Sequence, residues 1–220
     1  MSENNLALKH LVREPVEGGR TPPPLLLLLH GVGSNEDDLF GLAPYLDERF
    51  LIVSARAPVA LEYGGYGWFS IDFTPRGMEA DLDQAKKSLG MLTGFIDGLV
   101  NAYGANSQRV YLAGFSQGAM MSLALLLTCP EKLAGVVAMS GRLPVNELER
   151  EPDREFLRDK PVMVTHGLYD PVLPIENGRL ARDYLGRLPV ALTYREYPMA
   201  HEVSAESLRD VTRWLTDALG

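Results

Sequence analysis

The sequence predicts an α/β fold in which a mostly parallel central sheet carries helices on both faces. Three observations support this prediction. Several short runs are apolar at every position, as in strands that are covered on both faces. The segments between these runs have apolar residues at spacings of three and four, which is typical of helices that bury one face. Strands and helices also alternate along the chain, and this order builds parallel βαβ units.

The first strand is expected at residues 25–29, an uninterrupted run of leucines between Pro24 and His30. The prolines before this run and the glycine after His30 mark the turns that bound it. Five further runs are expected to form strands at residues 50–54, 109–113, 133–139, 161–165 and 191–197.

The clearest helical pattern covers residues 82–103, where the apolar residues form one face. Gly90, Gly94 and Gly98 share another face of this helix, and each costs about 1 kcal/mol relative to alanine. We expect these glycines to allow close packing of the helix on the sheet. Further helices are expected at residues 37–46, 117–128, 175–188 and 204–219.

A single domain is expected to span residues 1–220, with its core between about residues 24 and 219. A chain of this length can bury one substantial core but is short for two. The sequence has no internal repeat, and the charged stretch at residues 142–160 is too short for a separate domain. We therefore expect an α/β architecture with no large cap domain.

Charge and cysteine content exclude several classes of function. The formal net charge is -8 and there is no cluster of Lys and Arg, so nucleic-acid binding is not expected. The single cysteine, Cys129, cannot form an internal disulfide, which fits a reducing compartment and a cytoplasmic location. The first residues lack the pattern of a signal peptide, and the longest apolar run is far below the ~18 residues of a membrane span. Stable membrane insertion is therefore not expected, and the sequence leaves a homodimer open.

The segment Gly114-Phe-Ser116-Gln-Gly118 has the G-x-S-x-G pattern, and it lies between an apolar strand and an apolar helix. A turn of this sharpness leaves no room for side chains at the two flanking positions, which explains both glycines. The bare pattern is common by chance. In this context it predicts that the Ser116 hydroxyl projects from the turn as a nucleophile.

A serine hydroxyl needs a base to accept its proton and an acid to orient that base. In α/β-hydrolases the order along the chain is Ser, then Asp or Glu, then His. Asp170 follows the strand expected at residues 161–165, and His201 lies between the last strand and the last helix. We therefore expect Ser116, Asp170 and His201 to form a catalytic triad.

Other interpretations of these positions remain open. His166 also follows Ser116, although its place at the end of a strand favours a structural role. Asp170 could instead stabilise a turn, and His201 could be an ordinary loop residue. Further carboxylates follow Ser116 in charge-rich or helical segments; these are Asp153, Asp159 and Asp183.

Two backbone N–H groups are needed to hold the oxyanion that forms when a serine attacks a carbonyl. One comes from the residue after the nucleophile, which here is Gln117. The other comes from the loop after an earlier strand, and the position in His30-Gly-Val-Gly33 favours Val32. A phosphate-binding interpretation of this loop is weak, because neither G-K-[ST] nor the full G-x-G-x-x-G follows.

The segment at residues 63–69 mixes glycines with aromatic residues. Trp68 and Phe69 are expected either to line the substrate pocket or to anchor this loop to the core. The histidines are scattered and there is no cysteine cluster, so no metal and no cofactor are expected.

Together these motifs resemble the phospholipase/carboxylesterase family of α/β-hydrolases, which includes the acyl-protein thioesterases. The resemblance runs from about residue 25 to residue 219 and depends on residues 29–33, 114–119 and 166–172 and on His201. It implies a small hydrolase without a cap, and it assigns the same triad and oxyanion donors. Residues 34–38 and 67–72 are more similar to those of bacterial carboxylesterases in this family.

The expected function is hydrolysis of small to medium acyl esters through an acyl-enzyme intermediate, with a small-molecule ester as the substrate. A lysophospholipase or acyl-thioesterase activity is the alternative, and an acyltransferase could use the same triad. A non-catalytic binding module is less favoured, because the residues of a complete triad are present.

Overall fold

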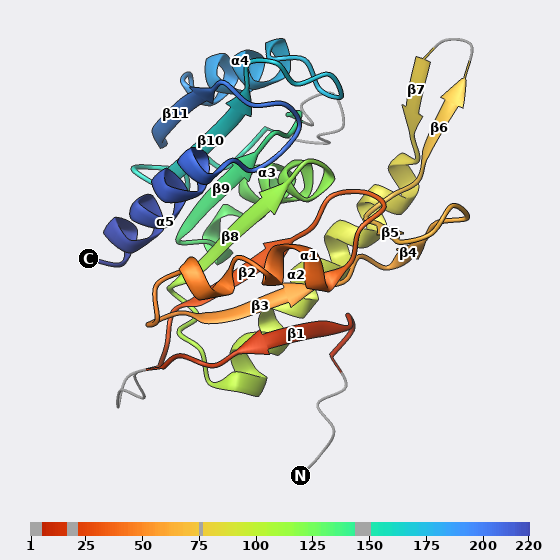
Figure 1. Cartoon of the computed structure of the whole chain (residues 1–220). Coiled ribbons are helices and arrows are strands. Elements are labelled where there is room, and N and C mark those ends of the chain that lie inside the picture. Colours follow the sequence, from red (N-terminus) through yellow and green to blue (C-terminus); the bar gives the residue numbers. More distant parts are fainter. Residues whose placement is uncertain (1–5, 17–21, 75–76, 144–150) are drawn as a thin grey trace.

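The computed structural model describes residues 6–16, 22–74, 77–143 and 151–220. Its main sheet has seven strands in the order β1-β3-β2-β8-β9-β10-β11 (Figure 1). These strands are β1 (His10–Arg13), β2 (Leu25–Leu29), β3 (Leu51–Ala55), β8 (Val110–Phe115), β9 (Gly135–Met139), β10 (Pro161–Gly167) and β11 (Ala191–Tyr197). All neighbouring strands are parallel except β1 and β3. The predicted α/β fold with a mostly parallel sheet is confirmed.

Helices cover both faces of this sheet (Figure 1). One hydrophobic cluster joins the sheet to α2 (Leu82–Tyr103), α3 (Gln117–Thr128) and α4 (Glu176–Leu185). A second cluster joins the other face to α1 (Glu36–Phe40), the short 3-10 helix η1 (Ala43–Tyr45) and α5 (Ala205–Leu219). Another 3-10 helix, η2 (Pro130–Lys132), follows α3.

Strand β2 shows why the leucine run is apolar at every position. Leu25, Leu27 and Leu29 belong to the cluster on one face of the sheet. Leu26 and Leu28 belong to the cluster on the other face. Side chains alternate between the two faces of a strand, so a central strand that is covered twice has no exposed position.

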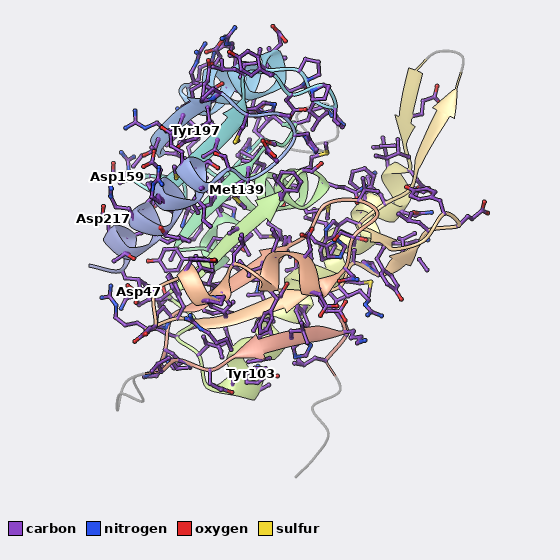
Figure 2. The ribbon with its side chains drawn as sticks, viewed as in Figure 1. Asp47, Tyr103, Met139, Asp159, Tyr197 and Asp217 are labelled. Carbon is purple, nitrogen blue, oxygen red and sulfur yellow. The ribbon has the colours of Figure 1, made fainter. Side chains whose placement is uncertain are left out.

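Strand β1 was not predicted from the sequence. It is short, its four residues are all half-buried, and it lies antiparallel at the edge of the sheet. The His10 ring anchors it to the end of α2, with Nε2 3.0 Å from the hydroxyl of Tyr103. The position of Tyr103 is labelled in Figure 2. Such a strand has no apolar run, because only part of its surface faces the core.

Two small hairpins precede α2. The first pairs β4 (Val59–Ala60) with β5 (Tyr66–Gly67), and the second pairs β6 (Ile71–Thr74) with β7 (Gly77–Ala80). The β6–β7 hairpin extends away from the main sheet (Figure 1). Neither hairpin was predicted.

The helix predicted at residues 37–46 is divided into α1 and η1. Asn35 caps α1 by accepting a hydrogen bond from the Asp37 N–H at 2.8 Å. The chain then turns at Gly41, and Pro44 lies at the start of η1. Proline lacks the N–H that a continuous helix would need at this position, so the pattern ends early.

The sheet-packing role predicted for the α2 glycines is wrong. A Cβ atom at Gly90 or Gly94 would have no neighbour within 4 Å, and both residues are exposed. At Gly98 it would meet Leu6 at 2.7 Å, which belongs to the N-terminal segment rather than to the sheet. The helix reaches the sheet with its apolar face instead, through residues such as Leu92 and Phe95.

The charged stretch at residues 142–160, which is too short for a separate cap domain, is described in part. Residues 144–150 lie outside the described residues, and residues 151–160 form turns between β9 and β10. Across the described parts of the chain, no helix combines the length and the apolar character needed to cross a membrane.

Two glycine-to-alanine substitutions should have opposite effects on stability. A Cβ at Gly118 would lie 1.9 Å from the carbonyl oxygen of Leu29. Gly118→Ala should therefore lower the free energy of unfolding by at least about 2 kcal/mol. Gly94→Ala should raise it by about 0.5–1 kcal/mol, because alanine favours an exposed helix without any clash. Urea unfolding followed by circular dichroism measures both, and a stable Gly118→Ala variant would contradict the close approach.

Candidate active site

The candidate site lies at the carboxyl ends of four parallel strands. Ser116 follows β8, Asp170 follows β10, His201 follows β11, and the loop from His30 to Gly33 follows β2. Parallel strands end at the same edge of a sheet, so residues that are far apart in the sequence meet there.

Ser116 occupies a strained turn between β8 and α3. Its backbone has φ 53° and ψ -115°, which is unusual for a residue with a side chain. A Cβ at Gly114 would lie 2.3 Å from the Gly118 carbonyl oxygen, so the strand and the helix leave no space there. The Ser116 N–H donates to the Met139 carbonyl at 2.9 Å, which ties the turn to β9.

The structure brings the three predicted residues into one hydrogen-bonded chain. His201 Nε2 lies 2.9 Å from Ser116 Oγ, and His201 Nδ1 lies 2.7 Å from Asp170 Oδ2. The carboxylate accepts the hydrogen of Nδ1, so Nε2 presents its lone pair to the hydroxyl. Ser116 and Asp170 are only 7% and 6% exposed, which shields this chain from bulk water.

Asp170 makes the contacts that each of its two interpretations requires, to a turn and to His201. Its Oδ1 accepts hydrogen bonds from the N–H groups of Val172 at 2.9 Å and Leu173 at 2.8 Å, which is a turn-stabilising arrangement. Its Oδ2 accepts from His201. The turn therefore fixes the carboxylate in the orientation in which it bonds the histidine.

His166 lies beside this carboxylate, with no hydrogen bond to Ser116. It is fully buried, and its Nε2 lies 2.7 Å from the Leu173 carbonyl and 3.6 Å from Asp170 Oδ2. The carbonyl can only accept, so Nε2 carries the hydrogen. His166 thereby donates a hydrogen bond to Leu173, the last residue of the Asp170 turn, which agrees with the structural role that its position suggested.

The competing carboxylates do not join the site. Asp153 accepts a hydrogen bond from the Glu155 N–H, and Asp183 pairs with Arg182. Asp159 lies in a left-handed turn with φ 55°. The imidazole of His201 is also in contact with an aromatic side chain, the Phe115 ring, with 4.9 Å between the two ring centres.

The two predicted oxyanion donors flank Ser116. A Cβ at Gly31 would lie 3.3 Å from the Cβ of Ser116, so the β2 loop runs directly alongside the serine. Gln117 is the first residue of α3, where a backbone N–H has no partner within the helix. Among the hydrogen bonds of the described residues, none uses the N–H of Val32 or of Gln117. Their role as oxyanion donors remains a prediction.

Trp68 and Phe69 lie in the core behind the site. Trp68 is 0% exposed and Phe69 is 5% exposed. The Trp68 indole donates to the His30 carbonyl at 3.0 Å, and its ring lies 5.8 Å from the His30 ring. These contacts favour the anchoring interpretation of the two rings. Their predicted role in substrate binding remains a prediction.

His30 supports the β2 loop in its neutral form. Its Nδ1 donates to the Gly31 carbonyl at 2.7 Å, and its Nε2 accepts from the Ala57 N–H at 3.0 Å. Burial lowers the pKa of His30 below its ordinary value. A protonated ring would direct a second N–H at the Ala57 N–H, so the neutral form fits this environment.

An ion pair that the sequence did not predict holds the end of this loop. Glu36, which is 2% exposed, receives hydrogen bonds from Arg56 at 2.5 and 2.7 Å, and Lys9 lies 3.2 Å away. Arg56 also donates to the Tyr66 hydroxyl at 2.9 Å. Burial raises the pKa of Glu36, but hydrogen bonds from Arg56 and Lys9 outweigh burial and lower it to about 2.

Among the described residues, no three His, Cys, Asp or Glu side chains are grouped so that they could hold a metal ion. The groups gathered at this site are instead a hydrogen-bonded hydroxyl, an imidazole with a carboxylate behind it, and two available N–H groups. This arrangement can form and break an acyl bond.

Comparisons with known proteins agree on one family. The model of the family described as "Phospholipase/Carboxylesterase" matches residues 13–219. A probable carboxylesterase, SOBER1-like, of Arabidopsis thaliana is 31% identical, covering 86% of this chain and 77% of the relative. An acyl-protein thioesterase 1 of Kluyveromyces lactis is also 31% identical, covering 89% of this chain and 92% of the relative.

Solved structures show the same fold. The esterase PE8 is similar with a TM-score of 0.82 and 27% identity, over 96% of this chain and 99% of that protein. The Bacillus cereus carboxylesterase is similar with a TM-score of 0.84 and 24% identity, over 99% of this chain and all of that protein (100%).

The Glu36 ion pair predicts how stability depends on pH. The pKa of Glu36 is lowered from 4.5 to about 2 by folding, so its stabilising effect is complete above pH 4.5 and is lost as the pH falls toward 2. Glu36→Gln should be less stable than wild type at pH 7, with a gap that closes below pH 4.5. Urea unfolding at pH 7, 5, 4 and 3 measures this gap. A gap that stays constant with pH would contradict the assignment.

Proposed function

This chain belongs to the phospholipase/carboxylesterase family, and on that premise we propose that it hydrolyses small to medium carboxylic esters with Ser116 as the nucleophile. The observation that carries the proposal is the hydrogen-bonded chain from Ser116 Oγ through His201 to Asp170. The names of the relatives agree with a hydrolase of acyl esters or thioesters. The single domain that we propose for residues 1–220 includes these three residues and both proposed N–H donors.

The first half of the reaction acylates the serine. His201 Nε2 takes the proton of the Ser116 hydroxyl while Oγ forms a bond to the ester carbonyl carbon. The N–H groups of Val32 and Gln117 hold the resulting oxyanion, and one such donor is typically worth about 3 kcal/mol. The carbonyl reforms as the bond to the alcohol breaks, and His201 gives its proton to the leaving oxygen.

The second half releases the acid. Water takes the place of the alcohol, His201 removes its proton, and the hydroxide attacks the acyl carbon. The tetrahedral intermediate collapses to a free acid, and Ser116 recovers its proton. Asp170 remains a carboxylate throughout and stabilises the imidazolium that forms twice per cycle.

Thioester hydrolysis is a second candidate, and the similarity to an acyl-protein thioesterase favours it. The same nucleophile, base and oxyanion donors would serve, because only the leaving atom changes from oxygen to sulfur. We place either reaction in the cytoplasm, since a protein with one cysteine, Cys129, needs no oxidising compartment.

Hydrolysis of p-nitrophenyl esters from acetate to palmitate tests this function. Wild type should turn over the shorter esters, and Ser116→Ala should lose at least about a thousandfold in kcat, because alanine has no hydroxyl to attack the ester carbonyl. A palmitoyl thioester assayed in parallel separates the second candidate from the first. Folded wild type that cleaves neither substrate would overturn the proposal.

A further inference from the structure

The side chain of Gln117 has a position that its proposed backbone role does not explain. It is 1% exposed and ends at the loop that follows β5. Its Oε1 accepts from the Trp68 N–H at 2.6 Å, and its Nε2 donates to the Phe69 carbonyl at 2.7 Å. The two ends of the amide are thus bonded to successive residues of one loop, so the amide has a single orientation.

The same loop is bonded to the segment that carries Val32. The Tyr66 N–H donates to the Ser34 carbonyl at 2.8 Å, and the Gly33 N–H donates to the Tyr66 carbonyl at 2.9 Å. A Cβ at Gly65 would lie 2.0 Å from the Gly33 carbonyl oxygen, so the two backbones are in direct contact. Residues 65–69 therefore contact the Val32 segment through their first part and Gln117 through their last part.

Gly67 lies between the side chains of Val32 and Gln117. A Cβ at this residue would be 3.2 Å from Gln117 Oε1 and 3.4 Å from the Val32 side chain. The Trp68 indole adds a third bond between the loop and the Val32 segment, at the His30 carbonyl. The loop thus fills the space between two segments that belong to different elements of the fold.

An oxyanion is stabilised only if both donors lie about 2.7–3.1 Å from the same oxygen. The Val32 N–H is set by the loop after β2, whereas the Gln117 N–H is set by the start of α3. We infer that the Gln117 side chain is a positioning residue, which sets the separation of these two N–H groups through residues 65–69. This inference rests on the proposed hydrolase function of the same site.

A purely structural role for this side chain would have different consequences. Loss of a buried hydrogen bond lowers stability wherever it occurs. Loss of the donor separation would lower kcat at nearly constant KM, because the oxyanion exists in the transition state and not in the bound ester. The KM-against-kcat split therefore distinguishes the two roles.

Gln117→Met tests the inference, because methionine keeps the length of the side chain and removes both hydrogen bonds. Gln84→Met is the matched control. Gln84 Oε1 accepts from the Ser70 N–H at 2.8 Å, so it binds the same loop but connects it to α2 rather than to Ser116. Both variants are assayed with a short p-nitrophenyl ester, with a fluorophosphonate probe to count reactive serines and with phenylboronic acid as a transition-state analogue.

We expect Gln117→Met to lower kcat by about ten- to a hundredfold with KM within about twofold. Its affinity for phenylboronic acid should fall by a similar factor to kcat/KM. Gln84→Met should keep kcat within about twofold of wild type. If Gln117→Met does not fold, Gln117→Glu takes its place with the same expectation, since glutamate still accepts from Trp68 but no longer donates to Phe69.

Three results would overturn the inference. These are an unchanged kcat in the Gln117 variant, an equal loss in Gln84→Met, or a rise in KM alone, which would make the loop a substrate-binding element. A failure of the proposed function is separate, because wild type itself would then be inactive and Ser116→Ala would change nothing.

Discussion

The contact between α3 and β2 is the constraint on which the rest of the site depends. The helix begins so close to the neighbouring strand that a Cβ at Gly118 would clash with the Leu29 carbonyl. A Cβ at Gly114 would in turn clash with the Gly118 carbonyl. The turn at this approach gives Ser116 a positive φ of 53°, and its hydroxyl makes no capping hydrogen bond to the helix. A serine at the N-cap position usually accepts a hydrogen bond from a backbone N–H of the helix. Ser116 is the N-cap of α3, but its side-chain oxygen bonds His201 instead. The strained backbone of Ser116 thus leaves its hydroxyl available to His201 rather than to the helix.

The other groups of the site reach Ser116 from independent strands. Two of these groups lie on loops whose shape is fixed by bonds of their own: the Asp170 turn by Val172 and Leu173, and the β2 loop by His30 and the Glu36 ion pair. Fixed loops on a rigid sheet hold reacting groups more accurately than mobile ones, and misplacement by about 1 Å can cost a hundredfold in rate. The helices on both faces supply this rigidity by burying the sheet.

Much of this arrangement could be predicted from the sequence, because its determinants are local. The leucine run of β2, the glycines around Ser116 and the chain order of Ser116, Asp170 and His201 all follow from short-range patterns. Strand β1 and the small hairpins were missed, because they are short and lack a fully apolar run. The burial of Trp68 could not be decided either. It depends on bonds to Gln117 and His30, which are distant in sequence and have no periodic signal.

The placement of β11 at the edge of the sheet has a consequence for how the protein inactivates. Among the described strands, β11 pairs only with β10, and the loop after it carries His201, whereas Ser116 follows a central strand. Edge elements open at a lower free energy than central ones in native-state fluctuations. Fraying of β11 would withdraw the proposed base while the nucleophile and the core stay in place. Loss of activity by this route would be a local event, distinct from unfolding of the domain.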